Sequence, residues 1–163
     1  PYKVGDYIEA QGNEGTVKEI LLFHTIVMTN DLRTIYIPNG QMSTTVVINQ
    51  SRSELRRAQW VVGIEYGNDI THAKKVIQNC LDAEPRLLRE PTSEAGEPLA
   101  PFFIEVTNLN ASSVDIMVQA YVKRADYLDV RFKMNEALYA AIDADPALNI
   151  PFPTNTLHIV NKQ

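Results

Sequence analysis

The sequence predicts a small β-barrel followed by a ferredoxin-like α+β domain and a separate C-terminal strand. About five short β-rich runs, separated by turn residues, occupy the first part of the chain. A polar stretch at residues 49–54 then interrupts the β pattern. Beyond it the order is strand, helix, strand, strand, helix, strand, which is the ferredoxin-like order. We therefore place a β-domain at residues 1–52, an α/β domain at 53–149 and a C-terminal strand at 150–163.

The β-rich runs of the first domain are short and closely spaced. Residues 7–9 form the first run, and Gly12 and Gly15 are expected to bracket a tight turn, because glycine reaches positive φ without a Cβ penalty. Asn30-Asp31 and residues 38–40 are further turn signals. The remaining runs lie at residues 17–22, 25–28, 34–37 and 46–48. Strands of this length with close turns favour a small barrel that leaves few free edges.

The second domain opens with an alternating strand and a helix. Residues 56–64 alternate in polarity, which predicts a strand with one apolar face. Asp69 is a favourable N-cap for the helix that follows, and Pro85 marks its exit. Between these two residues, apolar side chains recur at the spacing of one helical face: Ala73, Val76, Ile77, Cys80 and Leu81.

A proline-rich loop at residues 88–101 leads into two more strands. Residues 102–107 alternate, and residues 114–122 form the clearest alternating strand of the sequence. The polar stretch between them, at 108–113, is predicted to be a hairpin loop. Together these runs supply the second and third strands of the ferredoxin-like order.

The last helix and the C-terminal strand complete the predicted order. Asp126 is expected to cap the helix, whose core stripe is Val130, Met134, Ala137, Leu138, Ala141 and Ile142. Asp145-Pro146 closes it, and Ile150-Pro151-Phe152-Pro153 is stiff and extended. Residues 154–160 then return to strand character.

Composition limits the classes of protein to consider. The net charge of −5 argues against a nucleic-acid partner, which normally selects a basic surface. The apolar runs are all much shorter than the ~20 residues that a spanning helix needs. Because the chain begins on Pro1 rather than Met, we expect it to be a fragment of a longer protein. The single cysteine, Cys80, excludes an internal disulfide, and its place on the helical stripe predicts a buried small hydrophobe.

No pattern of catalytic or ligating residues emerges from the sequence. His24, His72 and His158 are far apart in the chain, and none has a second ligand at metal-binding spacing. Neither a Ser/His/Asp signature nor a glycine-rich phosphate loop is present. We therefore predict no enzymatic activity, no metal site and no cofactor.

An ordered set of segments resembles a known family. The segments are Pro1-Tyr2-Lys3-Val4-Gly5-Asp6-Tyr7-Ile8-Glu9, Gly15-Thr16-Val17, Ile37-Pro38-Asn39-Gly40, Asn49-Gln50-Ser51-Arg52, Gly63-Ile64-Glu65-Tyr66-Gly67-Asn68-Asp69-Ile70, Ala111-Ser112-Ser113 and Ile150-Pro151-Phe152-Pro153. In this order, and over nearly the whole chain, they resemble the cytoplasmic region of small-conductance mechanosensitive channels, the MscS family. The family usually has Phe where this chain has Tyr2.

The resemblance implies an architecture and a function. The first domain would have Sm-like (SH3-like) barrel form, and Pro1 would follow a pore-lining transmembrane helix. The final strand would join a barrel shared by all subunits of a homo-oligomeric ring, heptameric in the best-known members. The ring would lie on the cytoplasmic side of the inner membrane and enclose a vestibule. Inorganic ions would reach the pore through side portals, and the channel would protect the cell from osmotic shock.

The resemblance also assigns a gating role to Pro38, Asn39 and Gly40. In the family, the matching loop lies against the pore-helix region and is implicated in gating and inactivation. Asn39 and Gly40 can both take left-handed turn geometry and so present amides to a neighbouring helix. The residues alone favour an ordinary β-turn.

Two further features leave alternatives open. Arg52, Arg56 and Arg57 cluster near the domain boundary; they form either a solvated face with weak ion pairs between the domains or a charge that lines a portal. The aromatic residues Trp60, Tyr2, Tyr7, Phe102 and Phe103 offer apolar area for contacts between subunits.

The alternative function is a soluble, oligomeric small-molecule- or RNA-binding module without a channel. A ferredoxin-like domain can bind small molecules, and a small barrel can bind RNA. The acidic balance of the chain weakens the RNA version.

Overall fold

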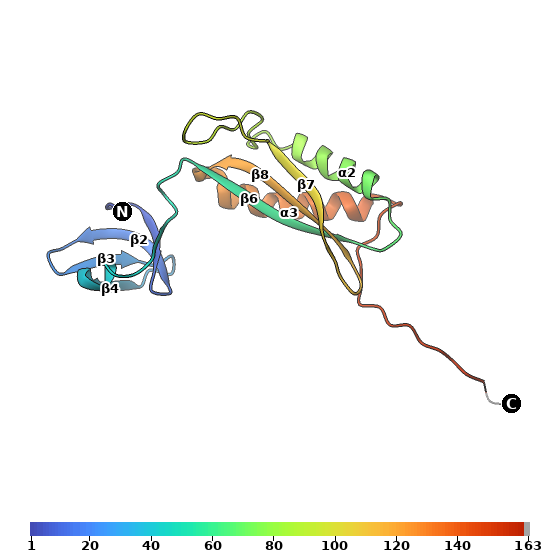
Figure 1. Ribbon diagram of the computed structural model, residues 1–163, viewed down its shortest axis with the longest axis horizontal. Coiled ribbons are helices and arrows are strands. Elements are labelled where there is room, and N and C mark those ends of the chain that lie inside the picture. The colour runs from blue at the N-terminus through green and yellow to red at the C-terminus, as the bar shows by residue number, and fades with distance from the viewer. Residues whose placement is uncertain (162–163) are drawn as a thin grey trace. The chain divides into compact units, whose positions relative to one another are not determined.

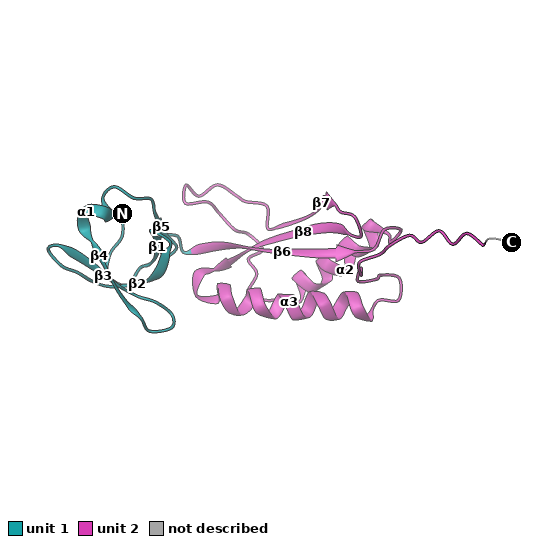
Figure 2. Ribbon diagram, turned by 90° about the horizontal axis from the view of Figure 1, so that it is seen from below, with its two compact units in different colours: residues 1–54 teal, residues 55–163 magenta. Residues whose placement is uncertain are grey.

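The computed structural model describes residues 1–161 and contains two compact units (Figure 2). The first unit comprises residues 1–54, and the second begins at residue 55. The boundary that the sequence suggests, after residue 52, falls in the connection between the last strand of the first unit and the first strand of the second. No helix in the described part of the chain combines the length and the apolar character needed to cross a membrane.

The first unit is an antiparallel sheet with one short helix (Figure 1). Its elements are β1 (Tyr7–Ala10), β2 (Asn13–Ile20), β3 (His24–Met28), β4 (Thr34–Pro38), α1 (Asn39–Met42) and β5 (Val47–Asn49). The strand order is β4-β3-β2-β1-β5. Because β4 and β5 are the two outer strands and do not pair with each other, both edges of the sheet stay open within the chain, whereas the sequence predicts a small barrel that leaves few free edges. The core of this unit is Ile8, Ala10, Val17, Val27, Ile37 and Met42.

The two glycines that the sequence assigns to one turn have different roles. Gln11 and Gly12 form the two-residue connection from β1 to β2, with φ angles of 52° and 72°, as a type I′ hairpin requires. Gly15 lies inside β2, outside that turn. A Cβ on Gly15 would lie 2.3 Å from the carbonyl oxygen of Met28 on β3. Glycine is therefore needed at position 15 because two strands approach closely there.

The second unit packs two helices on one face of a sheet. Its elements are β6 (Leu55–Ile64), α2 (Ile70–Asp82), β7 (Phe102–Leu109), β8 (Val114–Lys123), the 3₁₀ turn η1 (Arg124–Asp126) and α3 (Tyr127–Ala144). The antiparallel strand order is β6-β8-β7, which is the arrangement of the first three strands of the predicted ferredoxin-like fold. Alternate residues of β6 and β8 and one stripe of each helix form a single core.

The ends of the helices agree only in part with the sequence-based prediction. The Asp69 carboxylate accepts the backbone N–H of His72 at 3.2 Å, so the predicted N-cap of α2 is confirmed. The predicted side-chain cap of α3 is wrong. Asp126 stands at the N-cap position, but it makes no side-chain capping bond because the preceding 3₁₀ turn already holds it in helical geometry.

Trp60 belongs to the core and does not form a contact surface. Its side chain is 4% exposed, and its indole Nε1 donates to the carbonyl of Arg131 on α3 at 2.9 Å. A buried tryptophan commonly finds such a partner for its N–H. The suggestion that Trp60 supplies area for contacts between subunits is therefore wrong.

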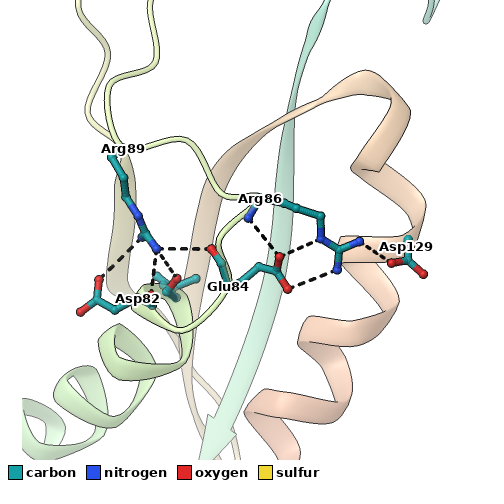
Figure 3. Close-up of polar contacts among 6 residues, drawn as sticks. Asp82, Glu84, Arg86, Arg89 and Asp129 are labelled. Atoms are coloured by element: carbon teal, nitrogen blue, oxygen red, sulfur yellow. Dashed lines mark hydrogen bonds and ion pairs between the residues drawn. The ribbon is translucent and has the colours of Figure 1, made fainter.

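An arginine pair fixes the connection between α2 and β7 (Figure 3). Arg86 Nε lies 2.8 Å from the Glu84 carboxylate, and the same guanidinium pairs with Asp129 on α3. These hydrogen bonds from Arg86 lower the pKa of both carboxyl groups. Arg89 donates to the carbonyls of Leu81, Asp82 and Glu84 at 3.0–3.3 Å, so it adds side-chain donors at the C-terminal end of α2, where helix carbonyls lack intrahelical partners.

Residues 150–161 form neither a helix nor a strand, whereas the sequence predicts a strand at 154–160. Within a single chain, the sixth element of the ferredoxin-like order is therefore not formed among the described residues. Its predicted place in a barrel shared by several subunits stays a prediction. Residues 162 and 163, which that prediction includes, lie outside the described part of the chain.

Candidate functional site

The Pro38-Asn39-Gly40 segment is the junction between β4 and α1. Pro38 ends the strand with φ −58° and ψ 132°, and Asn39 begins the helix. Neither Asn39 nor Gly40 has a positive φ. The expected left-handed turn is therefore wrong, because the backbone enters a right-handed helix directly after the proline. The backbone N–H of Asn39 is bonded within the unit and is not presented to a neighbouring helix.

Asn39 joins this junction to the turn between β2 and β3. Its backbone N–H donates to the carbonyl of Phe23 at 2.8 Å. Its side-chain Nδ2 donates to the carbonyls of Leu21 and Leu22, at 2.8 and 3.1 Å. Both N–H groups of the amide side chain thus bond to one turn, which is also closed by the backbone N–H of Leu21 donating to the carbonyl of His24 at 2.8 Å.

A buried threonine extends the same network to the N-terminus. Thr25, which is fully buried, donates from Oγ1 to Oδ1 of Asn39 at 2.7 Å. The Tyr2 hydroxyl lies 2.9 Å from the same Oγ1. Because a hydroxyl carries one proton and Thr25 gives its proton to Asn39, the Tyr2 hydroxyl must be the donor. Tyr2, Thr25 and Asn39 therefore form a chain of hydrogen bonds that ends at the β2–β3 turn.

The turn held by this network exposes apolar side chains to solvent. Leu22 is 82% exposed and Phe23 72% exposed, and Leu21 is about half-exposed. We call residues 21–23 the apolar turn. The hydrogen bonds of Asn39 help to hold it in position, yet the side chains of Leu22 and Phe23 are largely uncovered by the rest of the described chain. Adjacent exposed apolar side chains of this kind mark a surface that binds another apolar surface.

Sequence reasoning identified Asn39 but missed its partners. Thr25 is an ordinary residue of a β-rich run, and nothing in the sequence distinguishes it. The apolar turn did carry a signal, because Leu21, Leu22 and Phe23 are consecutive apolar residues next to a turn. An amphipathic strand would have alternated there.

The three arginines near the domain boundary do not form one cluster within a unit. Arg52 belongs to the first unit, and Arg56 and Arg57 belong to the second. Arg56 is half-buried, with its guanidinium 3.8 Å from the centre of the Tyr127 ring. Arg57, its neighbour on β6, points to the opposite, exposed face.

His72 and Cys80 occupy structural positions, whereas His24 and His158 are exposed. His72 Nε2 lies 2.7 Å from the Asp145 carboxylate and so joins the start of α2 to the end of α3. The backbone N–H of Ala147 and, to a lesser extent, His72 lower the pKa of Asp145. Cys80 is half-buried against the core, and this burial raises the pKa of its thiol. Among residues 1–161, no group of three His, Cys, Asp or Glu side chains is placed to hold a metal ion.

Family models match both units. The model described as the β-domain of mechanosensitive ion channels matches residues 1–52. The model described as the C-terminal region of the mechanosensitive channel MscS matches residues 58–145. The two matches follow one another along the chain and together cover most of it.

Two relatives and two solved structures agree with these matches. A small-conductance mechanosensitive channel of Edwardsiella ictaluri is 31% identical over 159 residues, covering 98% of this chain and 52% of the relative. A small-conductance mechanosensitive channel of Helicobacter pylori is 32% identical over 163 residues, covering 99% of this chain and 55% of the relative. The closed-state crystal structure of Helicobacter pylori MscS superposes with a TM-score of 0.87 at 30% identity, over 99% of this chain and 60% of that one.

The likeness extends to a more distant structure. Arabidopsis thaliana MSL1 superposes with a TM-score of 0.67 at 20% identity, over 88% of this chain and 50% of that one; at this identity the likeness concerns the fold alone. The chain spans about half the length of the relatives that it matches. On the strength of the two family models, the chain belongs to the MscS family of mechanosensitive ion channels, of which it carries the β-domain and the C-terminal domain.

Proposed function

We propose that this chain forms the vestibule region of a mechanosensitive channel on the cytoplasmic side of the inner membrane. Its tasks are assembly of the subunits, control of ion access and coupling to the gate, and the channel protects the cell during osmotic shock. Family membership supports this proposal, and the relatives are channels in which a further half of the chain lies outside the matched region. The alternative of a soluble binding module finds no support among these relatives.

The observation that carries the coupling role is the apolar turn and its attachment to Asn39. Leu22 and Phe23 expose apolar surface at a fixed position, which suits contact with an apolar helix or lipid that moves when the channel opens. Tyr2, near the expected pore helix, is bonded into the same network. Of Pro38, Asn39 and Gly40, it is Asn39 that acts on gating in this proposal, by helping to hold the apolar turn in place.

The sheet of the first unit supports assembly into a ring. Its outer strands β4 and β5 lie at opposite edges of an open sheet, and exposed strand edges pair readily with other strands. A contact between unlike edges of successive copies is heterologous, and it closes into a ring when the rotation allows. We propose seven copies, as in the best-known members of the family. Inorganic ions pass the side portals, and the exposed side chains of Arg52 and Arg57 are the candidates among the three arginines to bias that passage by their charge, since Arg56 is stacked on Tyr127.

Recording from the intact protein in liposome patches tests the proposal. We expect stepwise currents that appear when suction stretches the patch and that disappear when the tension is released. The control is a patch of the same lipid without protein. A protein that is inserted and correctly folded, yet passes no current at tensions up to rupture of the patch, would contradict the proposed function.

A further inference from the structure

The outer edge of β6 is the place where the chain after α3 would be expected to add a fourth strand. In the ferredoxin-like order that strand lies beside the first strand of the domain, which here is β6. The chain does arrive there. The backbone N–H of Glu65, just beyond β6, donates to the carbonyl of Asn149 at 3.1 Å. Two residues further on, the Pro151 ring lies 3.6 Å from the position of a Cβ on Gly63.

The two prolines after this bond occupy the positions that would have to donate next. Alternate residues of a strand direct their N–H and C=O groups to the same edge. The N–H and C=O groups of Gly63 and Val61 therefore point to the outer edge of β6, as those of Glu65 do. An antiparallel ladder continued from the bond between Glu65 and Asn149 brings Pro151 opposite Gly63 and Pro153 opposite Val61. Neither proline has an N–H, so neither can donate to the carbonyls of β6.

The side chains beyond the prolines are also wrong for a fourth strand in this register. The core side of β6 carries Trp60 and Val62, and residues directly opposite share a face of the sheet. The register would therefore place Thr154, Thr156 and His158 over the apolar core. It would turn Leu157 and Ile159 toward solvent. A segment meant to cover this edge would have the opposite alternation.

The chain instead leaves the sheet past the tip of the β7–β8 hairpin (Figure 1). The backbone N–H of Thr154 donates to Oγ of Ser112 in that hairpin loop at 3.3 Å. Beyond this contact the apolar side chains of the segment are fully available, with Leu157 82% exposed and Ile159 85% exposed. The same segment thus has strand-like apolar residues and no strand partner within its own chain, among the residues that the structure describes.

We propose that Pro151 and Pro153 divert the C-terminal segment from β6 of its own domain and so keep residues 154–161 available for pairing with other copies of the chain. The missing donors and the inverted alternation support the diversion, which begins where the N–H of Asn149 donates to Oδ1 of Asn68 at 2.9 Å and not to β6. Ser112 lies on the path of exit. The pairing with other copies rests on the proposed ring. The prolines are positioning residues in this account, since they set the path of the segment that follows them.

Amide hydrogen exchange of the intact protein tests the diversion. The variant carries Pro151→Val and Pro153→Val, which restore both missing donors. We expect exchange at the amides of Gly63 and Val61 to slow by about fivefold or more, as one net backbone hydrogen bond would produce. The matched control is Pro98→Val, in the exposed loop before β7, which should leave both amides unchanged.

A second variant and a fold control make the result decisive. Adding Thr154→Val and Thr156→Val gives the segment an apolar inner face, so both amides should slow further and the assembly should lose subunits. Unchanged exchange at both amides in both variants, with the fluorescence of buried Trp60 intact, would overturn the proposal. If the double variant failed to fold, the single Pro153→Val variant supplies the same readout at Val61. Because amide exchange does not depend on ion flow, this test and the channel proposal can fail separately.

Discussion

Replacing Gly15 with alanine is expected to unfold the first unit while the second unit stays folded. The added Cβ would lie 2.3 Å from the carbonyl oxygen of Met28 and 2.7 Å from its carbonyl carbon. Both atoms belong to the backbone of β3, so no side-chain rotation relieves the clash and the pairing of β2 with β3 has to change. We expect the free energy of unfolding of the first unit to fall by about 3 kcal/mol or more, which is at the upper end for single substitutions. A unit as small as residues 1–54 has little stability to spare.

Denaturant titration followed by amide exchange at Val17 and Val27, both in the core of the first unit, measures this loss. The matched control is Gly40→Ala. A Cβ on Gly40 meets no atom within 4 Å, and alanine favours the helical backbone that Gly40 adopts. The free energy of unfolding of the control should therefore lie within about 0.5 kcal/mol of that of the unaltered chain. A Gly15→Ala chain with unchanged exchange at both valines would refute the role assigned to the close approach of β2 and β3.

Replacing Asn39 with alanine is expected to produce the largest change in gating. The substitution removes the two bonds to the carbonyls of Leu21 and Leu22 and leaves the buried Thr25 hydroxyl without its acceptor. The apolar turn is then held less firmly, because only the backbone bonds from Asn39 to Phe23 and from Leu21 to His24 remain. A state of the channel that depends on this turn should lose about 1–3 kcal/mol of stabilisation. Its population relative to the other states should therefore fall roughly 5- to 150-fold. We expect reduced inactivation during sustained tension, measured in patches that contain the intact protein.

Asn39→Asp separates the two halves of this network. Aspartate keeps the acceptor for Thr25 but loses both donors to the apolar turn. If the turn matters, Asn39→Asp should reproduce the effect of Asn39→Ala on inactivation. If instead only the hydrogen bond accepted from Thr25 matters, the Asn39→Asp channel should inactivate as the unaltered channel does. Identical inactivation in all three proteins would remove Asn39 from the mechanism.

Local patterns predicted most of the second unit correctly. The alternation of β6 and β8 and the apolar stripes of α2 and α3 depend on residues near one another in the chain, so their periods are visible in the sequence. Asp69 was predicted as a cap for the same reason. Asp126 was not predicted correctly, because whether a residue caps depends on the geometry of the turn before it, which here is a 3₁₀ turn.

Features that depend on distant residues were not visible in the sequence. Gly15 was assigned to a turn, because its contact with Met28 follows from strand pairing across the sheet. Asn39 and Gly40 permit left-handed geometry but do not require it, and the bonds of Asn39 to residues 21–25 stabilise another arrangement. Thr25 gave no signal at all. Residues 154–160 have the pattern of a strand, but the partner of that strand lies outside this chain in our account.

The most direct test of the account is the mass of the intact protein, purified in detergent and measured in solution. In our account, the open strand edges and the C-terminal segment diverted from its own sheet pair with neighbouring copies. We therefore predict one closed species of seven subunits. A folded protein that carries one copy at every concentration would contradict the claim that this chain is shaped to surround a shared vestibule.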